Sequence, residues 1–294
     1  MFVLVDEQAK DPSCPSVSGM LKNLDLSKSN YYDWKKREPS DREYKRGFVC
    51  DLIQKIYDQN KGIYGAPKIC HELRKRRISI SVRTVGLYMR QMGLRACYIT
   101  PWTTTTRDPN FEASLQNILD ENFNPDNPDE VWCIDTTYIP TDSGFVYLTS
   151  IIDLFSRKIV AWDTADTLST EVVLTIIEKA KQRRNANKAL IMHSDRGSQF
   201  TSDAYKKVTS QMTNSYSAKG YPWDNACIES FHALIKREWL TRFKIKDIHE
   251  AHRLCFEYID AYYNTVRIHS HCDYMSPMAF EQLYYENHYE QDAA

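Results

Sequence analysis

The sequence predicts an α/β protein in which a basic, all-α module precedes a domain built around a β-sheet. Apolar residues recur at helical spacing through residues 41–95, whereas residues 131–166 contain three β-rich runs separated by turn residues. The charge is divided in the same way, because residues 35–107 carry 17 lysines and arginines against six acids, a net of +11. A segment as basic as this is typical of a surface that binds a polyanion such as DNA.

The composition excludes several classes of protein. Of the 294 residues, 42% are hydrophobic and 26% are charged, which is ordinary for a globular protein with a buried core. The eight cysteines include no C-x-x-C pair, so neither a zinc ribbon nor a disulfide framework is expected. No apolar run approaches the roughly 20 residues of a membrane span, and no signal peptide is recognisable. We therefore expect a cytoplasmic protein without a membrane partner.

The first 99 residues are predicted to be helical. Residues 1–40 form an N-terminal extension with short helices, and residues 41–99 contain three more. The third of these, over residues 82–92, has Ser81 as its N-cap and ends at Gly93. Three short helices with a basic third helix resemble a helix-turn-helix, whose last helix enters the major groove of DNA.

This third helix should present an apolar side to the core of the module and a polar side to DNA. The apolar side is predicted to consist of Val82, Val85 and Met89. The polar side is predicted to contact DNA through Arg83, Thr84 and Arg90. Because the periodicity alone would fit any small three-helix bundle, the prediction of DNA binding depends on the accompanying charge.

An acidic linker is predicted over residues 100–130, since residues 108–130 carry seven acids and no base. Beyond it we expect strands over 131–139, 145–153 and 157–166, a helix over 168–183, a strand over 189–195, and helices over 202–211 and 224–240. This element order is that of a ribonuclease-H-like domain, which we assign to residues 131–241. Residues 242–294 are predicted to be a C-terminal helical segment.

Three acids of this domain are candidates for one metal site. Asp135 lies in the first strand, Asp195 at the end of the fourth, and Glu229 early on the last helix. If the first and fourth strands are neighbours, the aspartates converge although 60 positions separate them. Clustered carboxylates raise one another's pKa values, and Mg²⁺, which prefers hard oxygen ligands, relieves this repulsion. Two Mg²⁺ ions about 3.5–4 Å apart, with Mn²⁺ as a substitute, can activate the attacking oxygen and stabilise the leaving oxygen of phosphoryl transfer.

Other polar residues surround these acids. Lys219, Lys236 and Arg237 are predicted to contact DNA phosphates near them. His193, two positions before Asp195, is predicted to brace the end of the fourth strand.

The sequence around the three acids resembles bacterial insertion-sequence transposases of the retroviral-integrase type. The resemblance is carried by WCIDTTYI (132–139), HSDRGSQFTS (193–202) and SAKGYPWDNACIESF (217–231). It continues in Lys236-Arg237-Glu238, Tyr263-Asn264, Arg267, His269 and Ser276-Pro277, and covers about residues 40–280. The HSD-x-GSQ-x-TS run, placed between the other two acids, is its most specific part.

The resemblance implies a DNA transposase with an Asp-Asp-Glu triad on a ribonuclease-H-like fold, preceded by a helix-turn-helix. Carried over position by position, it makes Asp135, Asp195 and Glu229 the metal ligands. Hydrolysis at a transposon end would free a 3′-hydroxyl, which then attacks a phosphodiester of the target without a covalent protein intermediate. The partners implied are double-stranded DNA and a second copy of the chain, since two ends must be joined. The chain would be a second-frame product, fused by frameshifting to a first-frame protein and associated with the bacterial nucleoid.

The chain departs from the family at two places. Only 33 residues separate Asp195 from Glu229, fewer than in most family members, and we expect the shortening near Met212–Ser215, in a connection. The C-terminal motif has Ile268 where proline is common, which leaves the exact fold of this tail open. Two roles are open for Arg267 and His269, which follow an aromatic-rich helix: contact with DNA, or packing of the C-terminal segment. Two alternative functions also stay open, a domesticated DNA-binding protein without catalysis and a ribonuclease-H-type nuclease.

Overall fold

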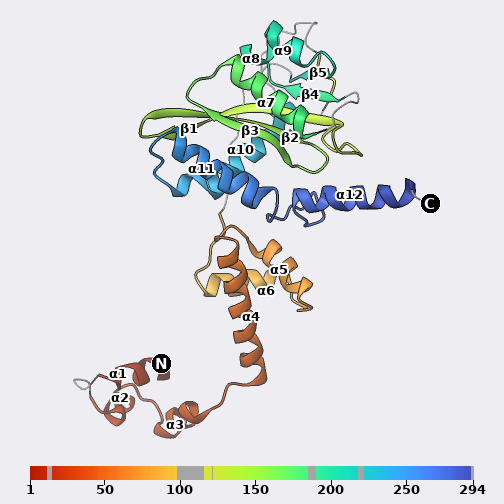
Figure 1. Cartoon of the computed structure of the whole chain (residues 1–294). Coiled ribbons are helices and arrows are strands. Elements are labelled where there is room, and N and C mark those ends of the chain that lie inside the picture. The colour runs from red at the N-terminus through yellow and green to blue at the C-terminus, as the bar shows by residue number, and fades with distance from the viewer. Residues whose placement is uncertain (12–14, 98–115, 121, 185–189, 218–221, 293–294) are drawn as a thin grey trace. The chain divides into compact units, whose positions relative to one another are not determined.

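The computed structural model describes the chain except for residues 12–14, 98–115, 121, 185–189, 218–221 and 293–294 (Figure 1). The chain divides into two compact units, Met1–Lys55 and Ile56–Ala294. Most of the linker predicted over 100–130 lies outside the described residues. In the part of the chain that is described, no helix combines the length and the apolar character needed to cross a membrane.

The first unit contains three short helices and most of a longer one. These are α1 (Phe2–Gln8), α2 (Val17–Asn23), α3 (Lys28–Lys36) and α4 (Asp41–Gln59), which extends into the second unit. Val5, Leu21 and Tyr31 form a small buried core between the first three helices. Apolar burial in this extension is therefore local to its own helices.

The helix-turn-helix consists of α5 (Ala66–Lys75) and α6 (Val82–Gln91). The predicted start and end of α6 are confirmed: the Ser81 hydroxyl accepts a hydrogen bond from the Thr84 backbone N–H at 3.1 Å, and Gly93 has a φ of 72°. Val85 and Met89 are buried as predicted. The prediction for Val82 is wrong, because this first residue of α6 lies beyond the buried face and is 40% exposed.

The second unit is built around a five-stranded sheet with the order β3-β2-β1-β4-β5. Strands β1 (Val131–Thr141), β2 (Gly144–Asp153) and β3 (Ile159–Ala165) form the predicted antiparallel meander, and β4 (Ile191–Ser194) runs parallel to β1. The ribonuclease-H-like prediction is confirmed, including the prediction that the first and fourth strands are neighbours.

One strand of this sheet was not predicted. The segment near Met212–Ser215, expected to lie in a connection, contains β5 (Thr213–Tyr216), which pairs in parallel with β4. Its sequence, TNSY, lacks the apolar alternation that identifies a strand. Ser215 is nevertheless fully buried, because its hydroxyl accepts hydrogen bonds from the backbone N–H groups of Ile118 and Leu119.

Helices cover both faces of the sheet (Figure 1). On one face α7 (Thr170–Arg183) closes the main core, in which Trp132, Ile151 and Ile176 are buried. On the other face lie α10 (Ala226–Glu238) and α11 (Ile248–Tyr258). The remaining elements are α8 (Ser198–Thr201), α9 (Asp203–Val208), η1 (Pro222–Asn225), η2 (Leu240–Arg242), the π-helix η3 (Ile259–Tyr263) and α12 (Pro277–Asp292).

The C-terminal segment is fastened to the sheet and to α10 by buried polar side chains. Arg267 makes a bidentate ion pair with Glu238 at the end of α10, with distances of 2.6 and 2.7 Å. The Asn264 amide bonds both the N–H and the carbonyl of Ile159 at 3.0 Å, and so pairs with the first residue of edge strand β3. Since Arg267 and His269 are 6% and 9% exposed, packing is the role that the structure gives them.

Because His269 is buried, we expect the free energy of unfolding of the protein to fall in acid. Burial, and then the adjacent Arg267 cation, lower the pKa of His269 to about 2, whereas an unfolded histidine titrates near 6.5. Below pH 6.5 the unfolded chain therefore binds a proton at this position that the folded chain does not, so stability falls as the pH falls. Between pH 7 and 4.5 this histidine should account for a loss of about 2.5 kcal/mol. Urea unfolding of His269→Phe should show a correspondingly shallower pH dependence, and His249→Phe, at an exposed position of α11, should not. Equal slopes for His269→Phe and the unmodified chain would contradict this assignment.

Candidate active site

Asp135, within β1, and Asp195, directly after β4, lie at the same level of two adjacent parallel strands. In the register of β1 and β4, Ile134 lies opposite Ser194, and each aspartate is the next residue of its chain. The Gly197 N–H donates a hydrogen bond to Asp195 Oδ1 at 2.8 Å, which fixes this carboxylate just after the strand. Burial raises the pKa of Asp195, and the negative charge of Asp135 adds to the rise.

Glu229 is delivered by the first turn of α10, which packs against β1. Loss of contact with water raises the pKa of Glu229, and the charges of Asp135 and then Asp195 raise it further. The structure therefore brings the three predicted carboxylates within electrostatic reach of one another, from β1, from the end of β4 and from α10. The 33-residue interval between Asp195 and Glu229 contains β5, which pairs in parallel with β4.

The donor set suits a hard divalent cation. Three carboxylates whose like charges oppose one another gain from a cation between them, and Mg²⁺ takes oxygen ligands in preference to others. Within the described residues, however, no three His, Cys, Asp or Glu side chains lie close enough together to enclose an ion. The chemistry of the residues thus fits Mg²⁺, and the carboxylates would have to approach one another on binding it.

His193 has the predicted bracing role. Its ring is fully buried, and its two nitrogens lie 2.9 Å from Ser215 Oγ and 3.1 Å from Ser217 Oγ. Burial lowers the pKa of His193 to about 4, so the ring is neutral at pH 7. This contact joins β4 to β5 and to the residue that follows it, directly beside Asp195.

A histidine that the sequence did not single out lies next to Asp135. His232 Nδ1 is 3.3 Å from Asp135 Oδ2, and His232 Nε2 is 2.8 Å from Ser150 Oγ on β2. Its spacing of three residues from Glu229 makes the two side chains neighbours on α10, where His232 is buried and Glu229 is exposed. That spacing was the available signal, although many buried histidines share it.

The three cations predicted to contact phosphate near the carboxylates differ in their surroundings. Lys219 lies outside the described residues. The Lys236 ammonium lies 4.5 Å from the centre of the exposed Tyr138 ring, and partial burial lowers its pKa while Asp135 opposes this change. Arg237 is 3.9 Å from Glu238, and its Nε is buried without a hydrogen-bond partner. Of the two that are described, Lys236 is the one whose charge interacts with Asp135.

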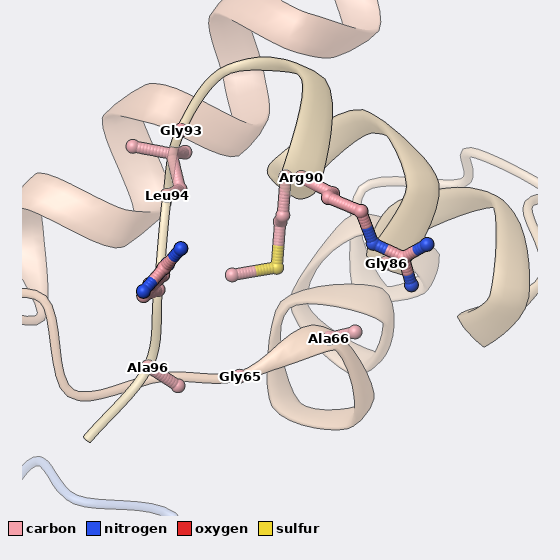
Figure 2. A pocket seen from close by; sticks show the side chains of 9 residues that line it. Gly65, Ala66, Gly86, Arg90, Gly93, Leu94 and Ala96 are labelled. Atoms are coloured by element: carbon pink, nitrogen blue, oxygen red, sulfur yellow. The ribbon is translucent and has the colours of Figure 1, made fainter. Parts of the chain in front are cut away.

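The three residues of the helix-turn-helix that were predicted to contact DNA differ in their exposure and in their contacts. Arg83 and Arg90 are exposed, whereas the Thr84 hydroxyl lies 2.8 Å from that of Ser81, so it is already engaged at the start of α6. Arg90 borders a hollow of about 600 Å³ between the start of α5 and the end of α6. Figure 2 shows Gly65 and Ala66 on one side of this hollow and Arg90 on another.

The chain matches known protein families over most of its length. A family model described as an integrase core domain matches residues 125–222, a second of the same description matches 210–277, and one described as an HTH-like domain matches 46–99. The transposase for insertion sequence element IS904 of Lactococcus lactis is 36% identical over 248 residues, 84% of this chain and 98% of that protein. Transposase InsF for insertion sequence IS3A of Escherichia coli is 32% identical over 272 residues, 90% of this chain and 94% of that protein.

Solved structures of lower similarity also match. A chain of the simian T-cell lymphotropic virus intasome is 10% identical, with a TM-score of 0.46 over 78% of this chain and 74% of that chain. The HTLV-2 integrase catalytic core domain in complex with magnesium is 14% identical, with a TM-score of 0.40 over 53% of this chain and 97% of that chain.

Proposed function

Because the chain belongs to the family of insertion-sequence transposases with an integrase core domain, we propose that it cuts DNA at the ends of a mobile element and joins those ends to a target. One observation carries the proposal. Asp135, Asp195 and Glu229 come from three separate elements, and beyond the effect of burial the charge of Asp135 raises the pKa of Asp195, while the charges of both aspartates raise that of Glu229. A protein that only bound DNA would gain nothing from this repulsion, and a phosphate-binding surface would be weakened by it.

The reaction consists of two phosphoryl transfers at one site. In the first, a water oxygen bonds to the phosphorus at the element's end, the bond to the 3′-oxygen breaks, and that oxygen takes up a proton. In the second, the freed 3′-hydroxyl loses its proton and bonds to a phosphorus of the target, whose own 3′-oxygen leaves. The number of phosphodiester bonds is conserved in the second step, so no external energy source is required.

Each carboxylate has the same task of holding positive charge at the reacting phosphate. When bound, Mg²⁺, or Mn²⁺ in its place, supplies the charge that activates the attacking oxygen and stabilises the leaving oxygen. Asp135, Asp195 and Glu229 are the residues that would hold it. Lys236, close to Asp135, is suited to bind a phosphate oxygen next to the one that reacts. Catalysis then consists mainly of positioning and charge neutralisation.

The partners follow from the same reaction. Two ends must be cut and joined together, so we propose at least a dimer of the chain on DNA. The basic helix-turn-helix would hold the DNA outside the reacting site. A first-frame protein fused by frameshifting would complete the enzyme.

A cleavage assay tests the proposal. The full chain is incubated with Mg²⁺ and linear DNA that carries the sequences flanking its gene, and nicked and joined products are separated on denaturing gels. We expect both products from the unmodified chain and neither from Asp195→Asn. The assay is repeated with the first-frame fusion if the chain alone is inactive.

The outcomes separate this proposal from its alternatives. If the chain and the fusion both bind DNA but neither cleaves it, a domesticated DNA-binding protein is favoured. Cleavage without joining would favour a nuclease. Cleavage that Asp195→Asn does not reduce would refute the site itself.

We expect Arg90 to contribute a measurable part of the affinity for DNA. It is an exposed cation that borders the hollow between α5 and α6. If it neutralises one phosphate, Arg90→Ala should weaken DNA binding about fivefold at 0.1 M salt and lower the slope of log affinity against log salt by about 1. Lys206→Ala removes the same charge from α9 and should leave the slope unchanged. Fluorescence anisotropy with a labelled duplex measures both variants, and equal slopes for Arg90→Ala and the unmodified chain would exclude this contact.

A further inference from the structure

We infer that His232 is a positioning residue: it fixes one carboxylate oxygen of Asp135 and ties Asp135 to the helix that carries Glu229. The inference rests on the proposed function, since it concerns the same site. His232 belongs to α10, while Asp135 belongs to β1 and Ser150 to β2. The three side chains therefore join the helix to both central antiparallel strands.

The geometry of this group is compact and dry. Asp135 and Ser150 lie directly opposite each other in the register of β1 and β2. The His232 ring spans both, with Nδ1 3.3 Å from Asp135 Oδ2 and Nε2 2.8 Å from Ser150 Oγ. The histidine is 4% exposed and Ser150 is fully buried, so water has little access to the contact between them, while the Asp135 side chain is 17% exposed.

The chemistry of the partners fixes which nitrogen carries the proton. A carboxylate only accepts hydrogen bonds, so the nitrogen that faces Asp135 must be Nδ1–H, because two acceptors would otherwise face each other. In a neutral ring Nε2 is then the acceptor, and the Ser150 hydroxyl donates to it. Ser150 thus selects the tautomer in which His232 directs a donor at Asp135.

Two consequences follow for the site. With Oδ2 facing His232, Oδ1 is the Asp135 oxygen outside this contact, and it is the one that would hold a cation. Neighbours that orient a ligand in this way raise metal affinity about 10- to 100-fold. Glu229 lies one turn before His232 on α10, so the same contact also sets the position of the helix that carries Glu229 relative to Asp135.

Mn²⁺ binding to the full chain tests the inference, with the free ion counted by electron paramagnetic resonance. His232→Phe keeps the ring volume and removes both nitrogens, and we expect it to weaken Mn²⁺ binding about 10- to 100-fold. His232→Asn keeps a donor near the position of Nδ1 and should recover most of that loss. A residue that only filled the core would show the opposite order, because phenylalanine fills the space better than asparagine. Circular dichroism establishes that each variant is folded.

Asp135→Asn separates this inference from the proposed function. If Asp135→Asn loses Mn²⁺ binding and His232→Phe binds within twofold of the unmodified chain, the inference is wrong and the proposed site stands. If Asp135→Asn binds Mn²⁺ normally, the proposed site fails and the inference fails with it. Should His232→Phe not fold, Ser150→Ala decides instead, since it removes the donor that selects the tautomer. Weaker Mn²⁺ binding by Ser150→Ala supports the inference, and unchanged binding refutes it.

Discussion

Glu229→Gln is expected to reduce strand cleavage at least about 1000-fold, equivalent to about 4 kcal/mol of transition-state stabilisation, without weakening DNA binding. Glutamine has the size of glutamate but not its charge, and the proposed reaction depends on that charge. The variant should be no less stable than the unmodified chain, because the like charges of Asp135 and Asp195 oppose an ionised Glu229. A loss of activity with an unchanged melting temperature would therefore identify a chemical role.

The matched control is Glu178→Gln, which removes the same charge from an exposed position of α7. It should leave cleavage and joining rates unchanged. Gel assays of both products, with anisotropy for DNA affinity, complete the comparison. Cleavage by Glu229→Gln within tenfold of the unmodified chain would show that the third carboxylate is not a ligand in the reaction.

The central part of the fold could be predicted because its strands are marked by local patterns. β1 to β3 are apolar runs separated by turn residues, and β4 is a short apolar run that ends on Ser194-Asp195. These patterns also predicted that Asp135 and Asp195 lie side by side, since the element order allows only a few topologies. The parallel pairing of β1 with β4 is the physical basis of that prediction.

The parts that could not be predicted depend on tertiary contacts without a local signal. β5 is a polar tetrapeptide whose strand conformation comes from pairing with β4 and from the contact of His193 with Ser215. His232 shares a helix face with Glu229, but its importance appears only when Asp135 and Ser150 are seen on either side of its ring. The engagement of Thr84 with Ser81 likewise depends on how the cap of α6 is built.

Arg267 shows the same limit for the C-terminal segment. Its motif left both contact with DNA and packing open, because an arginine suits either role. The contact with Glu238 shows that the role is packing. Glu238 lies 29 positions earlier, at the end of α10, and accepts hydrogen bonds from both Nε and Nη2 of the guanidinium. The Tyr258 hydroxyl donates a third hydrogen bond to the same carboxylate, at 2.6 Å. Arg267, Glu238 and Tyr258 together connect the C-terminal segment to α10 and α11.

Arg267→Met is accordingly expected to lower the free energy of unfolding by about 3–5 kcal/mol, since it leaves the buried Glu238 carboxylate without its bidentate partner and with only the more distant Arg237 at 3.9 Å. Glu238→Leu combined with Arg267→Met removes both charges and should recover most of that loss, because two apolar side chains need no solvation. Arg253→Met breaks the exposed pair with Glu257 on α11 and should cost less than about 1 kcal/mol. Urea unfolding of the three variants measures these differences. A double variant less stable than Arg267→Met would show that the ion pair stabilises the fold by more than the desolvation of its charges costs.

Because α10 carries both Glu229 and Glu238, Arg267→Met should also reduce the rate of cleavage. An arginine that only contacted DNA would instead change the affinity for DNA and leave the stability of the protein intact.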